Sequence, residues 1–325
     1  MSEEIKNNET EIREAIIKVV AFFNMFDYPL TLKEVWINLS VKCELVEVMK
    51  ILDEMEKPSL ILPLQGRQII ESRHGFYFLV GQEKNIKERL NRYSFTDRKF
   101  KRAMLASKIF KFIPWIKMIA IGNLLGAHNL KDNSDIDFFI ITEDKQIWLT
   151  RFFCAGITKI LGLRPRPGKS RDKICLSFYA GAKAMDLNGL MLKDKEALNN
   201  NDIYFIYWLA GLTPIFDNGG VYEKFISANL WLKEYLPNWQ PVNPLNQRQV
   251  KPVLSEFYHD LASLFIGGLE PQFKELQLRW LPAQLKNLMN QDSRVVINDQ
   301  IIKLHANDRR EEYRNKFSET MKGLM

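Results

Sequence analysis

The segment Asn133–Ile141, NSDIDFFII, places two carboxylates one residue apart at the start of a strongly apolar run. The run predicts a buried β-strand, and alternate residues of a strand point to the same face of its sheet. Asp135 and Asp137 should therefore lie a few ångströms apart. Two like charges held that close repel each other unless a cation lies between them. The segment predicts a divalent-cation site on a rigid strand; the alternative is a polar strand entrance that carries two acids without further purpose.

The residues before this run predict a second strand and a phosphate-binding turn. A strand is expected over residues 116–121, followed by Gly122-Asn123 and a short helix. Glycine permits a sharp turn and a close approach of the backbone to a ligand. The amides that open the next helix would point toward the same place, as a phosphate site requires. Gly122 and Asn123 are thus expected to cradle a triphosphate beside Asp135 and Asp137.

This order of elements resembles a known family. A strand, a glycine turn, a helix and then Ser134-Asp135-Ile136-Asp137-Phe138 resemble the signature of the DNA polymerase beta-like nucleotidyltransferase superfamily. The resemblance implies a central mixed-sheet nucleotidyltransferase fold and transfer of a nucleoside monophosphate from an NTP to a hydroxyl or phosphate acceptor. It implies that Asp135 and Asp137 hold Mg²⁺, or Mn²⁺ in its place, and that Ser134 helps to bind the nucleotide. The whole chain also resembles an uncharacterised bacterial group of this superfamily that begins with a winged helix.

Two positions depart from the family pattern. Asn123 stands where the family has serine, although an amide N–H can still donate to a phosphate oxygen. The family's third carboxylate belongs on a later strand, and the expected strand, KICLSFYA, carries Cys175 and Ser177 on the relevant face. Asp186 is the expected third catalytic carboxylate, and Asp172 a weaker substitute. The alternative function is a catalytically silent nucleotide-binding module that acts through protein or nucleic-acid contacts.

Basic residues surround the predicted site. The segment from Glu83 to Lys111 has ten basic and three acidic residues, and it is expected to form two helices, the second N-capped by Thr96. The loop Leu163–Lys173 is also basic, and its Lys169 and Arg171 are expected to bind the triphosphate. The alternative for both segments is a solvated surface.

The N-terminal part predicts three helices followed by a β-hairpin, which is the layout of a winged helix. Thr31 and Glu34 have the spacing of a capping box at the start of the second helix. The third helix, residues 43–57, is strongly acidic, and phosphates of duplex DNA would repel it. We therefore expect a protein-contact or structural role for this domain and no duplex DNA partner.

The sequence predicts an α+β protein in four parts: a winged helix at 1–82, a basic helical connector at 83–113, a nucleotidyltransferase core at 114–240 and a helical C-terminal domain at 241–325. The last part includes a short segment of β character, RVVINDQIIKLH. His259 and His305 are expected in helices as structural residues. Three scattered cysteines, a polar N-terminus and no long apolar run predict a soluble cytoplasmic protein without a membrane partner. The acceptor class, whether RNA, protein or small molecule, stays open.

Overall fold

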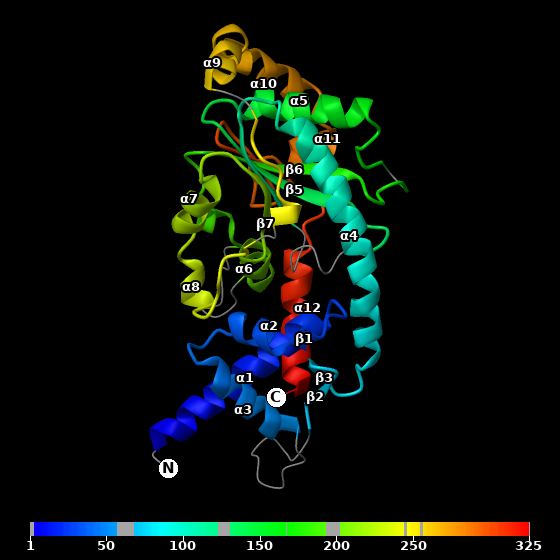
Figure 1. The fold of residues 1–325 in the computed structure, drawn as a ribbon, viewed down its shortest axis with the longest axis vertical. Helices are drawn as coiled ribbons and strands as arrows, with labels where there is room; N and C mark the ends of the chain where they lie inside the picture. The colour runs from blue at the N-terminus through cyan, green and yellow to red at the C-terminus, as the bar shows by residue number, and fades with distance from the viewer. Residues whose placement is uncertain are drawn as a thin grey trace. The chain divides into compact units, whose positions relative to one another are not determined.

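The computed structural model describes residues 3–56, 68–122, 131–166, 168–192, 202–243, 246–253 and 256–324 (Figure 1). The fold is mixed α+β, as predicted, and it contains a mixed sheet. The chain divides into two compact units: residues 1–94, 231–240 and 310–325 form the first, and residues 95–230 and 241–309 form the second. These units differ from the four expected segments, because residues 231–240 and the C-terminal helix belong to the first unit.

The first unit has the three helices that the sequence predicts, followed by a hairpin in the later part of the predicted β-rich segment, residues 59–80. Its elements are α1 (Glu3–Asn24), β1 (Leu30–Thr31), α2 (Leu32–Ile37), α3 (Leu45–Glu56), β2 (Ile70–Arg73), β3 (Phe76–Leu79), α8 (Leu232–Tyr235) and α12 (Arg310–Leu324). The strands form an antiparallel sheet in the order β1-β3-β2, in which the two-residue β1 was not predicted. The hairpin turn uses His74 and Gly75, both with positive φ. The first β-rich run expected in the hairpin, at residues 59–65, lies outside the described residues.

The capping box at the start of α2 is confirmed. The Thr31 backbone N–H donates to Glu34 Oε2 at 2.8 Å, and the Glu34 N–H donates to Thr31 Oγ1 at 3.4 Å. The C-terminal helix packs on α1 through aromatic pairs, with the ring centroids of Phe22 and Phe317 5.9 Å apart. This packing explains why the end of the chain joins the first unit.

The basic connector forms one helix, α4 (Lys84–Phe110), where the sequence predicted two. Thr96 lies inside the helix and is only 2% exposed, so the predicted N-cap is wrong. No proline or glycine interrupts this segment, and the helix ends before Pro114 as expected. Residues 84–94 belong to the first unit and 95–110 to the second.

The second unit is built on a six-stranded sheet in the order β7-β4-β5-β6-β9-β8. Its strands are β4 (Ile116–Ile121), β5 (Ile136–Thr142), β6 (Ile174–Gly181), β7 (Thr213–Asp217), β8 (Val295–Ile297) and β9 (Ile301–Leu304). β5 and β6 are parallel, and the other pairs are antiparallel. The β8–β9 hairpin confirms the β character predicted near residue 300 and brings that segment into the core sheet.

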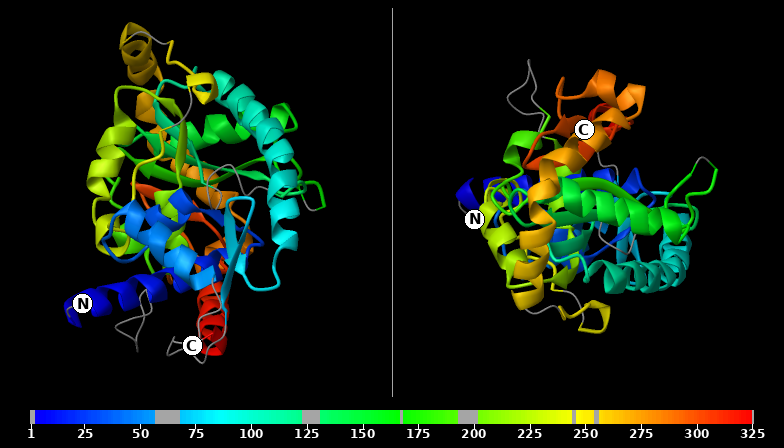
Figure 2. Two further views of the ribbon diagram at one scale, coloured as in Figure 1. Left: turned by 60° about the horizontal axis from the view of Figure 1, so that its bottom comes forward. Right: turned by 90° about the horizontal axis from the view of Figure 1, so that it is seen from above.

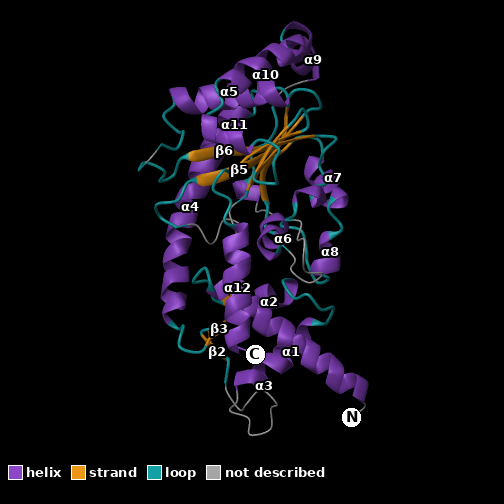
Figure 3. Cartoon of the chain, turned by 180° about the vertical axis from the view of Figure 1, so that it is seen from behind, coloured by secondary structure: helices purple, strands orange, loops and turns teal. Residues whose placement is uncertain are grey.

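Helices cover both faces of this sheet (Figure 3). They are α5 (Ile147–Ile160), α6 (Ile203–Ala210), α7 (Val221–Ala228), α9 (Glu256–Phe265), α10 (Glu270–Arg279) and α11 (Ala283–Leu288). α10 packs across α5 (Figure 2), where the rings of Phe152 and Phe273 lie 4.4 Å apart. None of the helices in the described ranges has both the length and the apolar character needed to cross a membrane.

The side chains of β5 alternate between the two faces. Ile136, Phe138 and Ile140 join the buried core that includes α5. Phe139 points to the other face, where its ring lies 6.1 Å from that of Trp208 on α6 and 5.4 Å from that of Phe225 on α7. Odd-numbered residues at the start of β5 therefore share the face of α6 and α7.

Candidate metal centre

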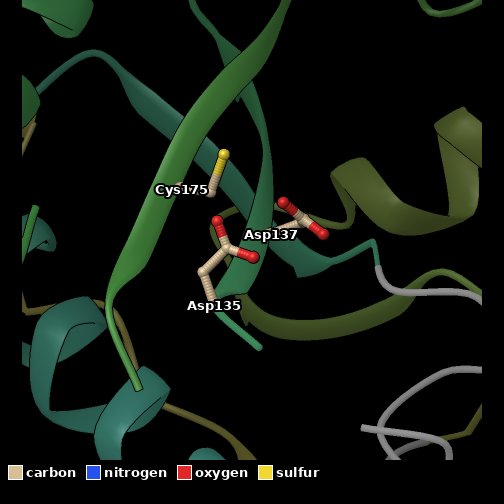
Figure 4. Close-up of side chains that lie close together, drawn as sticks. All are labelled: Asp135, Asp137 and Cys175. Carbon is tan, nitrogen blue, oxygen red and sulfur yellow. The ribbon is translucent and has the colours of Figure 1, made fainter. Parts of the chain in front are cut away.

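Asp135, Asp137 and Cys175 converge at the start of two parallel strands (Figure 4). Asp137 lies directly opposite Cys175 in the β5–β6 register. One ligand atom from each of the three side chains can be chosen so that all lie within 4.8 Å of one another. The predicted pairing of the two aspartates on one face is therefore observed, and a thiol occupies the third position. No other such group of His, Cys, Asp or Glu occurs among the described residues.

A β-bulge on β6 shapes this position. Between the pairs Asp137–Cys175 and Phe139–Phe178, β5 advances by two residues and β6 by three. An extra residue in one strand re-aims the neighbouring side chains, and such bulges are common beside functional sites. Ser177, inside the bulge, remains on the Cys175 side of the strand, with its Oγ 3.4 Å from Cys175 Sγ. Cys175 therefore faces the aspartates as predicted, whereas Ser177 contacts Cys175 and is not part of their group.

Burial and mutual repulsion dominate the electrostatics of the two aspartates. Burial, followed by the charge of Asp135, raises the pKa of Asp137 to about 7. Burial also raises the pKa of Asp135, although nearby Lys99 opposes the shift. Burial and the two carboxylates raise the pKa of the Cys175 thiol well above its usual range. All three pKa values are raised, which means that the site disfavours the negatively charged forms. The protein therefore supplies too little positive charge to balance them.

Gly122 lies beside the pair at the end of β4. Its N–H donates to the Asp137 carbonyl at 2.9 Å, which fixes the end of β4 against the start of β5. A Cβ at this position would lie 3.1 Å from the indole ring of Trp208. Glycine here is needed for close packing, whatever else approaches it. Asn123 lies outside the described residues.

Ser134 and the entrance to β5 are anchored by a buried lysine. Lys99 of α4 is completely buried, and its Nζ donates to the Ser134 carbonyl and lies 3.1 Å from Asp172 Oδ1. The Asp172 N–H donates to the same carbonyl at 3.2 Å. The loops that lead to Asp135 and to Cys175 are thereby tied together.

A second layer of ion pairs surrounds this anchor. Arg98 contacts both Asp132 and Asp172, with Arg98 Nε 2.8 Å from Asp172 Oδ2. The predicted phosphate ligand Arg171 instead lies 3.0 Å from Asp132 Oδ1 and is exposed. Part of the predicted basic surface is therefore used to position the loops. Asp172, proposed as a weak third acid, is also committed to these cations.

Lys169 and Asp186 lie in different surroundings. Lys169 is exposed in a tight turn of the basic loop, where its backbone pairs with Arg166.

Asp186 is exposed and lies beyond Gly181, the last residue of β6. Its Oδ1 accepts the N–H of Asn188 at 2.9 Å. Asp135 and Cys175 lie at the opposite, amino-terminal ends of the parallel strands, and Asp186 is no member of their group. The expected third carboxylate is thus not brought to the pair.

His305 is a neighbour of the site that the sequence did not indicate. It follows β9 and is not helical, so that prediction is wrong. Its Nε2 lies 2.6 Å from Ser177 Oγ, although the two residues are 128 positions apart. The only sequence signal was the β character of the preceding residues, which could not identify β6 as the partner strand. His259 is helical as predicted, in α9, and contacts Glu143.

The donor set fits a divalent cation. Mg²⁺ in nucleotide-dependent enzymes is commonly held by one or two carboxylates together with substrate phosphates. Asp135 and Asp137 offer two carboxylates at the start of one strand. Their pKa values are raised because burial and mutual repulsion are not balanced by nearby cations. Cys175 adds a softer donor on one side.

Comparisons with known proteins give no relative for this chain. No protein-family model, no curated protein and no solved structure matches it. The class of this protein must therefore be inferred from its own residues.

Proposed function

We propose that the chain is a metal-dependent nucleotidyltransferase. In this proposal the second unit is a polymerase beta-like nucleotidyltransferase core, and it moves a nucleoside monophosphate from an NTP to an acceptor. The supporting observation is the convergence of Asp135 and Asp137 at the start of β5, beside Gly122. The sequence resemblance supplies the reaction class.

Each residue near the pair has a distinct proposed role. Asp135 and Asp137 would hold Mg²⁺ or Mn²⁺, and the cation would neutralise the triphosphate and orient its α-phosphate. The Gly122 turn, with Asn123, would let the backbone approach the phosphates. Ser134 would contribute at the strand entrance that Lys99 fixes.

Basic side chains would contribute at the rim. Lys169 is exposed and would neutralise phosphate charge. Arg171 would do so only by leaving or sharing its ion pair with Asp132. In the transfer, an acceptor oxygen would form a bond to the α-phosphorus while the bond to the bridging oxygen breaks. Pyrophosphate would leave, and the proton of a hydroxyl acceptor would pass to solvent.

A specific observation favours a second candidate, the catalytically silent nucleotide-binding module. Cys175 occupies the position next to the pair where a third carboxylate is expected, and Asp186 lies elsewhere. A thiol is a poor Mg²⁺ ligand and a poor base at neutral pH. In this second candidate the chain would bind an NTP without transferring its nucleoside monophosphate to an acceptor.

The first unit is proposed to be a winged helix that contacts a protein partner. Three helices with a three-stranded antiparallel sheet support this proposal. The helix α3 carries exposed apolar residues, Val46 and Met49, among its acidic ones. Such a surface suits a protein better than the phosphates of duplex DNA.

Label transfer tests the proposal. Purified full-length protein is mixed with each α-³²P-labelled NTP, Mg²⁺ or Mn²⁺, and a cell extract that contains RNA, protein and metabolites. We expect label on an acceptor with wild type and none with the Asp135→Ala/Asp137→Ala variant. If NTP binds in an Asp135-dependent way but no label moves, the silent module becomes the better account.

A further inference from the structure

Cys175 is built into the acidic pair as a third donor. It pairs in register with Asp137, and its Sγ belongs to the same 4.8 Å group as the two carboxylates. In a tetrahedral zinc-type site, with bonds of about 2.0–2.3 Å, ligand atoms lie roughly 3.5 Å apart. Small side-chain rotations would bring the three atoms to that spacing around one ion.

The thiol also has ordered outer partners. Cys175 Sγ donates to Ser177 Oγ at 3.4 Å, and that hydroxyl is in turn held by His305 Nε2 at 2.6 Å. The β6 bulge places Ser177 on the Cys175 side, and β9 delivers His305. Outer partners of this kind orient a metal ligand and fix its direction. They form an observation independent of the acidic pair.

The other two cysteines lack these features. Cys154 is completely buried, and Cys43 is 6% exposed in the first unit, where Asn238 lies against it. Neither belongs to a group of ligating side chains among the described residues. Cys175 is partly accessible.

We propose that Cys175 binds metal together with Asp135 and Asp137, which makes the centre selective for a thiophilic divalent cation such as Zn²⁺ over Mg²⁺. Thiolate is a soft ligand that Zn²⁺ and Co²⁺ accept and Mg²⁺ does not. Binding replaces the S–H bond with a metal–sulfur bond and releases one proton to solvent. The fourth position remains for water or a phosphate oxygen. This inference deepens the proposed function and rests on its Asp135–Asp137 metal pair.

Cobalt(II) spectroscopy tests the thiol directly, without nucleotide. Co²⁺ is titrated into reduced, metal-stripped full-length protein, and absorption is recorded from the near-ultraviolet to the visible. We expect a thiolate-to-cobalt charge-transfer band together with the visible bands of a tetrahedral ion. Cys175→Ser should abolish the charge-transfer band and weaken Zn²⁺ binding by more than the roughly 10–100-fold that loss of an outer partner costs. Cys43→Ser, the matched control, should keep both.

A second measurement uses only the wild-type chain, in case Cys175→Ser does not fold. Iodoacetamide labelling of Cys175, located by mass spectrometry, should slow at least about tenfold when Zn²⁺ is added, and not when Mg²⁺ is added. Absence of Co²⁺ binding, binding without a charge-transfer band, or equal labelling with and without Zn²⁺ would each overturn the inference.

The outcomes separate this inference from the proposed function. Mg²⁺-dependent label transfer without a charge-transfer band leaves the transferase standing and removes the thiol from the site. A charge-transfer band that depends on Cys175, without label transfer under any metal, keeps the metal centre and removes the transferase.

Discussion

Asp132 and Asp172 differ from Asp135 and Asp137 in what surrounds them, although all four lie at the entrances of β5 and β6. Burial opposes ionisation of Asp172, yet hydrogen bonds and charges from Arg98 lower the pKa values of both Asp132 and Asp172. Lys99 and Arg171 add to the lowering. Burial instead raises the pKa values of Asp135 and Asp137. The protein neutralises the first pair with its own cations and leaves the second pair short of positive charge. The second pair is where our proposal places an external cation.

The largest expected effect comes from removing an acid of the second pair. Asp137→Asn should reduce label transfer roughly 1,000-fold or more, because in our proposal Asp137 holds the cation that neutralises the reacting phosphates. Asp186→Asn keeps the hydrogen bond to Asn188 and should leave transfer within about twofold. The two rates are measured side by side with saturating NTP and Mg²⁺. A large loss of label transfer in Asp186→Asn would contradict the exclusion of Asp186 from the site.

Substitution of Lys99 removes one of the cations that neutralise the first pair, Asp132 and Asp172. Lys99→Met should lower the free energy of unfolding by about 3 kcal/mol, because it removes a completely buried charge from a buried ion pair. Guanidinium unfolding, followed by near-ultraviolet circular dichroism, measures the change. An unchanged unfolding midpoint would show that the anchor is unimportant for folding.

The second pair should make stability depend on pH. A carboxyl with a raised folded-state pKa binds its proton more tightly in the folded chain than in the unfolded one. Without metal, the free energy of unfolding should therefore fall as pH rises from about 4 to about 7, by roughly 1–3 kcal/mol, and stay low above that range. Unfolding in EDTA at several pH values tests this, and the slope should flatten in Asp137→Asn. A wild-type curve that rises between those pH values would contradict the assignment.

The smallest effect is expected at the rim of the first pair. Arg171→Ala removes an exposed partner of Asp132, and exposed ion pairs contribute about 0–1 kcal/mol. Its unfolding midpoint should match that of wild type within error, and high salt should not change the comparison. A loss as large as that of Lys99→Met would mean that the loop depends on Arg171 for its position.

The local parts of this fold could be predicted from the sequence. Period-two alternation placed Asp135 and Asp137 on one face, and the Thr31–Glu34 spacing identified a helix start. Both depend on residues close together in the chain. The Cys175 position followed from the same kind of alternation on a neighbouring strand.

The long-range parts could not be predicted. The pairing of β9 with β6 brings His305 to Ser177, and no local pattern specifies which strands pair. The direction of β6 likewise decides where Asp186 lies. The basic segment that contains Arg98 and Lys99 was predicted to lie beside a phosphate site. In the structure both side chains instead form ion pairs with Asp172, a partner that local sequence does not reveal. Thr96 was predicted to be an N-cap from its residue type alone. Its burial within α4 depends on tertiary packing, which the local sequence does not show.

The most direct test of the central claim is Mn²⁺ binding, measured by the loss of the free-ion signal in electron paramagnetic resonance. Wild type and Asp135→Asn/Asp137→Asn are titrated at pH 8, above the raised pKa of Asp137 of about 7, with and without a non-hydrolysable NTP. The account predicts saturable Mn²⁺ binding by wild type, tighter with nucleotide and absent in the variant. Equal Mn²⁺ binding by the two proteins would contradict it, since the acidic pair would then have no role in holding the metal.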